Sequence, residues 1–167
     1  MKALSLCPPW SSAMALGLKR IETRGHNRFN GHRGLLAIAA TATWNKGVLD
    51  WFRQPFVYPD AHEMRQALQQ AGARPDNLPL GAVLCVVNVV DCVRAEDLLA
   101  CCCYYDMMKT ERIWGDYSPG RFGIVTDRCW RFREPIPTKG KQGLWDWEPP
   151  ENWRELCEEA TKIEKGG

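Results

Sequence analysis

Two continuous apolar runs constrain the fold of this chain more than any other feature. The first run is Leu35–Ala40, and the second is Ala82–Val90, which contains five valines. Apolar runs of this length that are rich in β-branched residues are typical of strands buried on both faces of a sheet. Short helices are expected between the strands, without a regular alternation of strand and helix. The pattern therefore predicts an α+β fold, either a mixed sheet or a small barrel with helices packed around it.

Proline, glycine and capping residues indicate where the other helices and strands begin and end. Gly17 is expected to end the first helix, because glycine adopts a left-handed backbone without steric cost. Thr43 and Asp60 are expected to cap the next two helices. The last segment has acidic residues first and lysines last, which favours a helix through its dipole. Helices are thus expected at 10–16, 44–53, 61–71 and about 150–165, and further strands at 3–6, 18–24 and 121–133.

Length and composition bound the class of protein. The chain has 167 residues, of which 45% are hydrophobic and 25% are charged, so we expect a single domain over residues 1–167. No apolar run reaches the roughly 18 residues that a membrane-spanning helix needs. The apolar part of the N-terminus is too short for a signal peptide. These observations predict a cytoplasmic protein, with a monomer favoured as its oligomeric state.

The chain contains eight cysteines, which would suggest disulfides in a secreted protein. Three of them (Cys85, Cys92 and Cys129) are assigned to core strands and three form the consecutive trio Cys101–Cys103, and no pair has the CxxC spacing. The histidines are not spaced from any cysteine as zinc ligands would be. We therefore expect reduced thiols, no metal site and no cofactor.

The stretch Gly17–Arg24 concentrates charge directly after the first helix. It holds three cations and one carboxylate within eight residues. Side chains alternate along a strand, so Glu22 and Arg24 share a face, and Lys19 can join them only if it precedes the regular strand. This stretch belongs to the segment 1–34, which has six lysines and arginines against one acidic residue; segment 112–145 has seven against three. If the fold brings the two segments together, they predict a basic cleft; a dispersed, solubilising charge is the alternative.

Four motifs follow one another along the chain. They are Pro9-Trp10 before a short helix and then Gly17, Lys19, Glu22 and Arg24; Arg33-Gly34 before an apolar strand; Gly115–Arg121, which reads Gly-Asp-Tyr-Ser-Pro-Gly-Arg; and Pro135, Pro137, Gly140, Gly143, Leu144 and Trp145. Together they resemble the ASCH (activating signal cointegrator homology) domain, a branch of the PUA-like fold, over nearly the whole chain. One departure is Pro8, which stands where the family usually has a glutamine.

The resemblance implies a PUA-like pseudo-β-barrel with a cleft beside the short first helix, and RNA or a nucleotide as the partner. Such a ligand needs cations for phosphate, a carboxylate or amide for a base edge, and an aromatic ring for stacking. The candidate ligand-binding residues are Trp10, Ser11, Lys19, Glu22, Arg24, Arg33, Arg121, Lys139, Lys141, Gln142 and Trp145. As alternatives, Trp10 and Trp145 are core residues, and Glu22 only holds Arg24 in place.

Some members of the family act on RNA or on modified nucleosides, which implies a small hydrolase as an alternative function. The candidate catalytic residues are Lys19, Glu22, Tyr117 and Ser118, with Glu111 as a further acid–base group. Family amidohydrolases that act on N4-acetylcytidine use a lysine, a threonine and a glutamate. Here Glu22 stands in the threonine's place, and Thr23 is expected on the opposite strand face. A metal-free ribonuclease is the other enzymatic option, and a protein-interaction domain without nucleic-acid activity is a third alternative.

Overall fold

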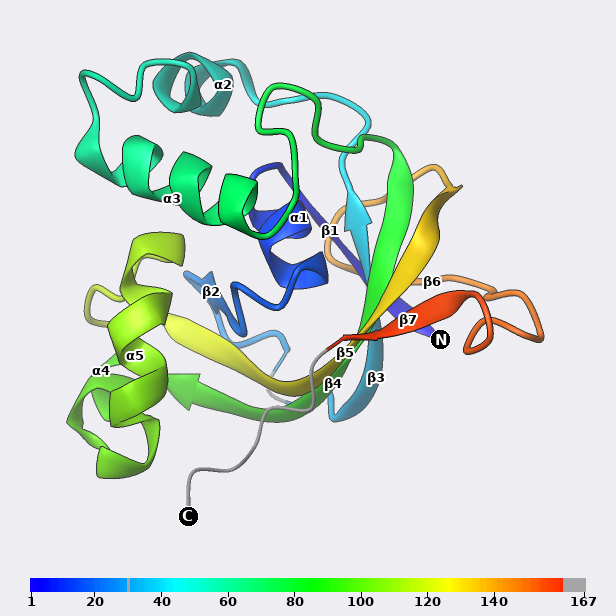
Figure 1. The fold of residues 1–167 in the computed structure, drawn as a ribbon. Helices are drawn as coiled ribbons and strands as arrows, with labels where there is room; N and C mark the ends of the chain where they lie inside the picture. Colours follow the sequence, from blue (N-terminus) through cyan, green and yellow to red (C-terminus); the bar gives the residue numbers. More distant parts are fainter. Residues whose placement is uncertain (30, 161–167) are drawn as a thin grey trace.

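A computed structural model describes residues 1–29 and 31–160 of the chain. In this part of the chain, one mixed sheet contains seven strands in the order β2-β5-β4-β3-β1-β6, and β7 also pairs with β5 (Figure 1). β1 and β3 are parallel, whereas the other pairs are antiparallel. The strands are β1 Lys2–Leu6, β2 Ile21–Arg24, β3 Gly34–Ala40, β4 Ala82–Arg94, β5 Phe122–Pro137, β6 Leu144–Asp146 and β7 Cys157–Ala160.

Short helices surround this sheet, so the predicted α+β class, with mixed strands and short helices, is confirmed. Figure 1 shows α2 and α3 in one group, α4 and α5 in another, and β2 between the two groups. The helices are α1 Trp10–Ala15, α2 Lys46–Phe52, α3 Pro59–Gln70, α4 Ala95–Ala100 and α5 Tyr105–Glu111, with 3-10 turns η1 Cys102–Tyr104 and η2 Arg112–Trp114. Among the described residues, no helix is long and apolar enough to cross a membrane.

The long antiparallel pair of β4 and β5 gives the sheet its curvature. Its register shifts at three places, between Val83 and Cys85, between Asn88 and Val89, and between Val89 and Asp91. Such irregularities bend a strand and increase its twist. Beyond these shifts, the first residues of β5 stay paired with the last residues of β4 and pair with β2 on their other side. The short strand β2 therefore forms one edge of the sheet.

The apolar runs are buried on both faces of the sheet, as predicted. Leu36 and Ile38 of β3 pack into one core cluster, whereas Ala37 and Ala39 pack into the cluster on the other face. The second cluster contains an aromatic group in which the rings of Phe132 and Trp147 meet edge to face. Two smaller clusters lie under α2 and α3 and under α4 and α5. They fix both groups of helices beside β2.

Three boundary predictions are wrong. Asp60 does not cap the third helix, because α3 begins at Pro59 with Tyr58 as its N-cap, and Asp60 lies within the first turn. Thr43 does not cap the second helix; α2 begins later, and the Asn45 side chain accepts a hydrogen bond of 3.2 Å from the Val48 N–H. The helix expected at about 150–165 is absent over its described part, where turns lead into β7. Cys157 pairs with Phe132 of β5, and Trp153 packs against Trp130, so tertiary packing overrides the helical charge pattern. Residues 161–165 lie outside the described residues.

The cysteines differ from the sequence expectation at one point. Cys101 and Cys103 form a disulfide, whereas Cys7, Cys85, Cys92, Cys102, Cys129 and Cys157 are free thiols. No group of three histidine, cysteine, aspartate or glutamate side chains within residues 1–29 and 31–160 is arranged to hold a metal ion.

Candidate functional site

The turn after α1 sets the direction in which the chain enters the site. Gly17 has a φ of +72°, in the left-handed region. Its N–H donates to the Met14 carbonyl at 3.0 Å, and the Leu18 N–H donates to the Ala13 carbonyl at 2.9 Å. This pair of hydrogen bonds is the Schellman motif, which glycine permits at the end of a helix. The regular strand β2 begins at Ile21 and not at residue 18 as expected, so Lys19 precedes it and meets the condition for joining Glu22.

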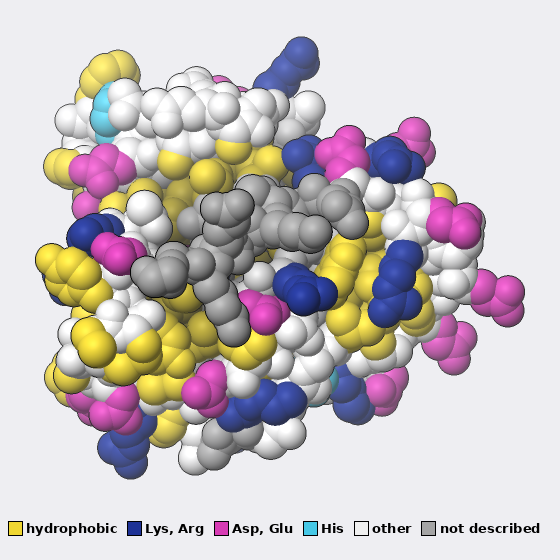
Figure 2. Space-filling model, turned by 60° about the horizontal axis from the view of Figure 1, so that its bottom comes forward, with side chains coloured by type: hydrophobic (Ala, Val, Ile, Leu, Met, Phe, Trp, Pro, Cys, Tyr) yellow, Lys and Arg dark blue, Asp and Glu magenta, His cyan; other side chains and the backbone are white. Residues whose placement is uncertain are grey.

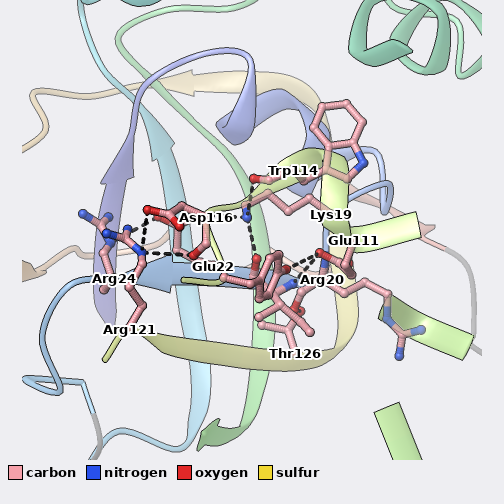
Figure 3. A network of polar contacts seen from close by, with 11 residues as sticks. Lys19, Arg20, Glu22, Arg24, Glu111, Trp114, Asp116, Arg121 and Thr126 are labelled. Atoms are coloured by element: carbon pink, nitrogen blue, oxygen red, sulfur yellow. Dashed lines mark hydrogen bonds and ion pairs between the residues drawn. The ribbon is translucent and has the colours of Figure 1, made fainter. Parts of the chain in front are cut away.

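Lys19 lies beneath the site and is only 2% exposed. Its ammonium donates to the carbonyl of Ile21 and to the carbonyl of Trp114, the latter at 3.1 Å, and forms an ion pair of 3.3 Å with Glu22 (Figure 3). An ammonium has three donors, and all three are directed to acceptors of the protein. Lys19 therefore joins β2 to η2 and orients Glu22 from behind.

A second buried charge fixes the start of β2. Glu111, which ends α5, is 1% exposed and accepts hydrogen bonds from the N–H groups of Arg20 and Ile21. Burial raises the pKa of Glu111, against the opposing effects of Lys19 and of the two N–H donors. The Tyr117 hydroxyl donates to the same carboxyl at 3.5 Å. Glu111 thus replaces the missing neighbour strand for two N–H groups of the sheet edge.

Two arginine–carboxylate pairs lie side by side at the end of β2. Arg24 forms an ion pair of 3.2 Å with Glu22, and Arg121 forms one of 3.4 Å with Asp116 while donating to the Asp116 carbonyl at 3.0 Å (Figure 3). The Arg121 guanidinium reaches over Gly25, where an added Cβ would lie 3.7 Å from its Nη1. These pairs hold both guanidinium groups at fixed positions and leave some of their N–H donors for another partner.

Ser118 acts on Asp116 within the same loop. Its hydroxyl donates to Asp116 Oδ1 at 2.6 Å, and its backbone N–H donates to the same oxygen at 2.9 Å. These hydrogen bonds, together with the nearby Arg121, hold the pKa of the Asp116 carboxyl below its usual range. Asp116 is therefore ionised and orients Arg121.

A cavity of about 470 Å³ opens above this network. β1 and the turn after it, α1, β2, α2, α3, η2 and the loop after η2 all contribute to its wall. The described lining residues are Ser5, Leu6, Cys7, Trp10, Glu22, Thr23, Arg24, Trp51, Asp60, Met64, Arg112, Ile113, Trp114, Gly115, Asp116 and Arg121. The cavity brings together residues that lie far apart in the sequence, in the place beside α1 that the resemblance implied.

The charge of this lining is balanced. Three arginines, Arg24, Arg112 and Arg121, face three acidic residues, Glu22, Asp60 and Asp116. The two basic segments, 1–34 and 112–145, do meet, since β2 pairs with β5. They also place the carboxylates of Glu22 and Asp116 in the lining. Cationic and acidic side chains are also interspersed on the face of the molecule in Figure 2. Local pairs of charges, rather than one positive field, characterise the cavity.

Two parallel indole rings form part of the cavity wall. The ring centroids of Trp10 and Trp51 are 6.4 Å apart, and their planes differ by 6°. Both side chains are half-buried, and both also line a shallow depression beside α2. Each therefore presents apolar ring surface to the solvent inside the cavity.

The cavity contains only some of the residues that the sequence indicated. Trp10, Glu22, Arg24 and Arg121 are in its lining, and Lys19 lies directly behind it. Ser11 is fully buried in α1, and no described residue forms a hydrogen bond with its hydroxyl. Arg33 is exposed and forms an ion pair of 2.8 Å with Asp91, outside the described lining.

The late basic segment lies beside the cavity and not in its described lining. Lys139, Lys141 and Gln142 are exposed in the loop between β5 and β6. This loop passes close to Ser5, because a Cβ at Gly140 would lie 2.6 Å from the Ser5 hydroxyl. The Trp145 ring belongs to the core, and its Nε1–H donates to that hydroxyl at 3.2 Å.

Tyr117 and Ser118 also lie outside the described lining, although both are in the loop that borders the cavity. Burial, reinforced by the nearby Glu111 and Glu22, raises the pKa of Tyr117 far above its usual range. The Tyr117 phenol therefore stays protonated and can donate a hydrogen bond, but it is not suited to act as a base at neutral pH.

Other lining residues were missed by the sequence analysis. Thr23 was expected on the opposite strand face, yet it lines the cavity together with Glu22 and Arg24, because the cavity wraps around the exposed edge of β2. Asp116 belongs to the motif Gly115–Arg121, from which the sequence analysis selected only Tyr117, Ser118 and Arg121 as candidate site residues. Trp51 and Asp60 belong to helices whose packing beside β2 has no local sequence signal.

No protein-family model matches the sequence, and no curated protein is significantly similar to it. Among solved structures, the fold is similar to that of ASCH from Zymomonas mobilis, which is 14% identical over 95% of this chain and 96% of that chain, with a TM-score of 0.49. A mutant form of the protein from the same organism is 14% identical over 93% and 94%, with a TM-score of 0.46. Both bear the name of the family that the four motifs resemble. At these values the similarity carries no conclusion about ligand or activity.

Proposed function

We propose that the cavity binds a nucleotide, either free or as part of an RNA strand. One observation carries the proposal: a single cavity has parallel indole rings in its wall and two carboxylate-oriented guanidinium groups at the end of β2. Aromatic rings stack on bases, and guanidinium groups bind phosphate through paired hydrogen bonds. The resemblance of the sequence motifs to the ASCH domain supports the same ligand class.

The size and the mixed charge of the cavity agree with such a ligand. Its volume of about 470 Å³ lies within the range of roughly 300–1,000 Å³ that is usual for small-molecule sites. The carboxylates of Glu22 and Asp60 accept hydrogen bonds and are suited to the amino groups of a base edge. In this arrangement the base stacks on Trp10 or Trp51, and Arg24 with Arg121 binds the phosphate. A cytoplasmic location, where RNA and nucleotides are abundant, belongs to the same proposal.

The test is a binding titration of the full chain with nucleoside monophosphates and short single-stranded RNA at several salt concentrations. Trp10→Ala is expected to weaken binding by about 5- to 150-fold, because base–aromatic stacking is worth about 1–3 kcal/mol. Arg24→Gln is expected to weaken binding and to make the salt dependence shallower by about 0.7 in log–log slope for one lost phosphate contact on a single strand.

Arg28→Gln is the matched control, because Arg28 is exposed in the loop after β2 and lies outside the described lining. Its substitution is expected to leave affinity unchanged. Equal losses of affinity in Arg24→Gln and Arg28→Gln would mean that the interaction is only a general attraction between cations and nucleic acid. If Trp10→Ala leaves the affinity unchanged, the stacking contact is refuted.

A small hydrolase is the second candidate, favoured by the position of Glu22. This carboxylate lines the cavity beside Thr23, and the Lys19 ammonium lies 3.3 Å behind it. A carboxylate held in this way can take a proton from a water molecule that attacks an amide or a phosphodiester. Incubation with N4-acetylcytidine and with RNA tests this role. Product from the wild type, and at least about 10²-fold less product from Glu22→Gln, would support catalysis. Binding without product would leave a binding module.

A further inference from the structure

A second cavity, of about 370 Å³, lies on another side of α1. Its wall is formed by the last residues of α1, by the connection between α3 and β4, and by the second half of β5. It shares no described lining residue with the candidate functional site. Its properties therefore do not depend on the function proposed for that site.

Three arginines, Arg74, Arg131 and Arg133, line this second cavity, and none of its described lining residues is acidic. Arg131 and Arg133 share a face of β5, since side chains alternate along a strand. That face is directed toward α1, because the Cys129 thiol on the same face contacts the Met14 carbonyl at 3.4 Å. Arg74 reaches the cavity from the loop that follows α3.

These three arginines have no described carboxylate partner, in contrast to four other arginines of the described chain. Arg24, Arg33, Arg65 and Arg121 each form an ion pair with an aspartate or a glutamate. Within residues 1–29 and 31–160, neither Arg74 nor Arg131 forms an ion pair, and Arg133 donates only to the backbone carbonyl of Glu155, at 2.9 Å. Glu158 lies opposite Arg131 in the β5–β7 register and makes no ion pair with it. Three like charges around one cavity attract an anion.

A buried hydroxyl adds a second, independent observation. Ser12 lines the same cavity and is 4% exposed, yet its hydroxyl has no hydrogen-bond partner among the described residues. Leaving a buried polar group unpaired is costly, so such a group in a native structure indicates a missing partner. An anionic oxygen inside the cavity would accept this hydrogen bond.

We propose that the second cavity binds the phosphate group of a phosphate ester, with Arg74, Arg131 and Arg133 as charged donors and the Ser12 hydroxyl as a neutral donor. Guanidinium groups match the geometry of phosphate oxygens and remain charged at any physiological pH. Leu78 and Leu84 provide an apolar wall for the rest of the ester. The phosphate is that of a free nucleotide or that of an RNA backbone, and the two sources share this chemistry.

The experiment follows the side-chain Nε–Hε NMR signals of the arginines in the full chain during titration with inorganic phosphate, with a nucleoside monophosphate and with short single-stranded RNA. Saturable shifts at Arg131 and Arg133 are expected with inorganic phosphate. Arg131→Gln is expected to weaken phosphate binding by about tenfold, the usual effect of losing one charge-assisted hydrogen bond. Arg128→Gln is the matched control, because Arg128 is exposed on the same strand and outside the described lining.

The titrations with ester and RNA identify the source of the phosphate. If Arg131→Gln weakens the binding of the monophosphate but not of RNA, the ligand is a free phosphate ester. If Arg131→Gln weakens RNA binding and makes the salt slope shallower by about 0.7, the ligand is a backbone phosphate. The absence of saturable shifts with all three ligands would overturn the proposal, as would equal losses in Arg131→Gln and Arg128→Gln. Trp10→Ala changes only the first cavity and must therefore leave the titration with inorganic phosphate at Arg131 and Arg133 unchanged. The failure of the first cavity as a nucleotide site can thus be distinguished from the failure of the second cavity as a phosphate site.

Discussion

Lys19→Met tests the conclusion that Lys19 holds the site together from behind. Methionine resembles lysine in length and fills irregular core space, so the substitution removes the charge and its three interactions while leaving little cavity. It leaves the Glu22 carboxylate, whose side chain is 12% exposed, with Arg24 as its remaining ion-pair partner, and it leaves the carbonyls of Ile21 and Trp114 without their donor. Removing one member of a buried ion pair costs about 3–5 kcal/mol of the free energy of unfolding.

The assay is urea denaturation at neutral pH, with Lys139→Met as the matched control because Lys139 is exposed in a loop. The control is expected to change the free energy of unfolding by no more than about 0.5 kcal/mol. Adding Glu22→Gln to Lys19→Met removes the carboxylate that has lost its buried partner and is expected to recover about 0.5–3 kcal/mol through the coupling of the two sites. If Lys19→Met costs no more than Lys139→Met, the buried network does not stabilise the fold and the reasoning is refuted.

Three further predictions concern the frame of the site. Gly123→Ala is expected to cost about 1–3 kcal/mol in urea denaturation, because its Cβ would lie 2.5 Å from Leu98 Cδ1 and 2.7 Å from Ile21 Cγ2, two fully buried side chains. Gly17→Ala is expected to cost about 1–2 kcal/mol, since its φ of +72° is left-handed, and a smaller effect would show that the turn relaxes. The raised pKa of Glu111 means that the folded state keeps this proton to a higher pH than the unfolded state. Its contribution to stability is therefore full below the ordinary glutamate pKa of 4.5 and is lost as pH rises through the folded pKa. Urea denaturation across the acidic range should show this slope in the wild type and lack it in Glu111→Gln; identical slopes would contradict the assignment.

The fold was largely predictable because its strongest signals are local. The run Leu35–Ala40 is apolar at every position, and the structure buries it on both faces as β3. Gly17 was placed correctly because only its own backbone conformation decides the end of α1. The last segment was misread because its charge pattern is local, whereas Trp153 and Cys157 are placed by packing against β5.

The site was predictable only in part, because its geometry depends on distant pairings. Glu22 and Arg24 share a face through simple alternation, and an ion pair between them was one of the alternatives considered. The burial of Lys19 depends on Trp114, which lies 95 positions away, and no local pattern distinguishes a buried ammonium from an exposed one. Trp51 forms a wall of the cavity only because α2 packs beside α1.

The buried side chains of Lys19 and Glu111 together form a clamp on β2, and neither residue belongs to the described lining of the cavity. Lys19 and Glu111 hold the strand through backbone carbonyl and N–H groups, which every amino acid provides. Asp60 and Arg112, by contrast, line the cavity without any hydrogen bond or ion pair to this clamp in the described chain. Substitutions at such lining positions can thus accumulate without moving β2. A lineage of such proteins could change its ligand in single steps, each of which leaves a folded protein.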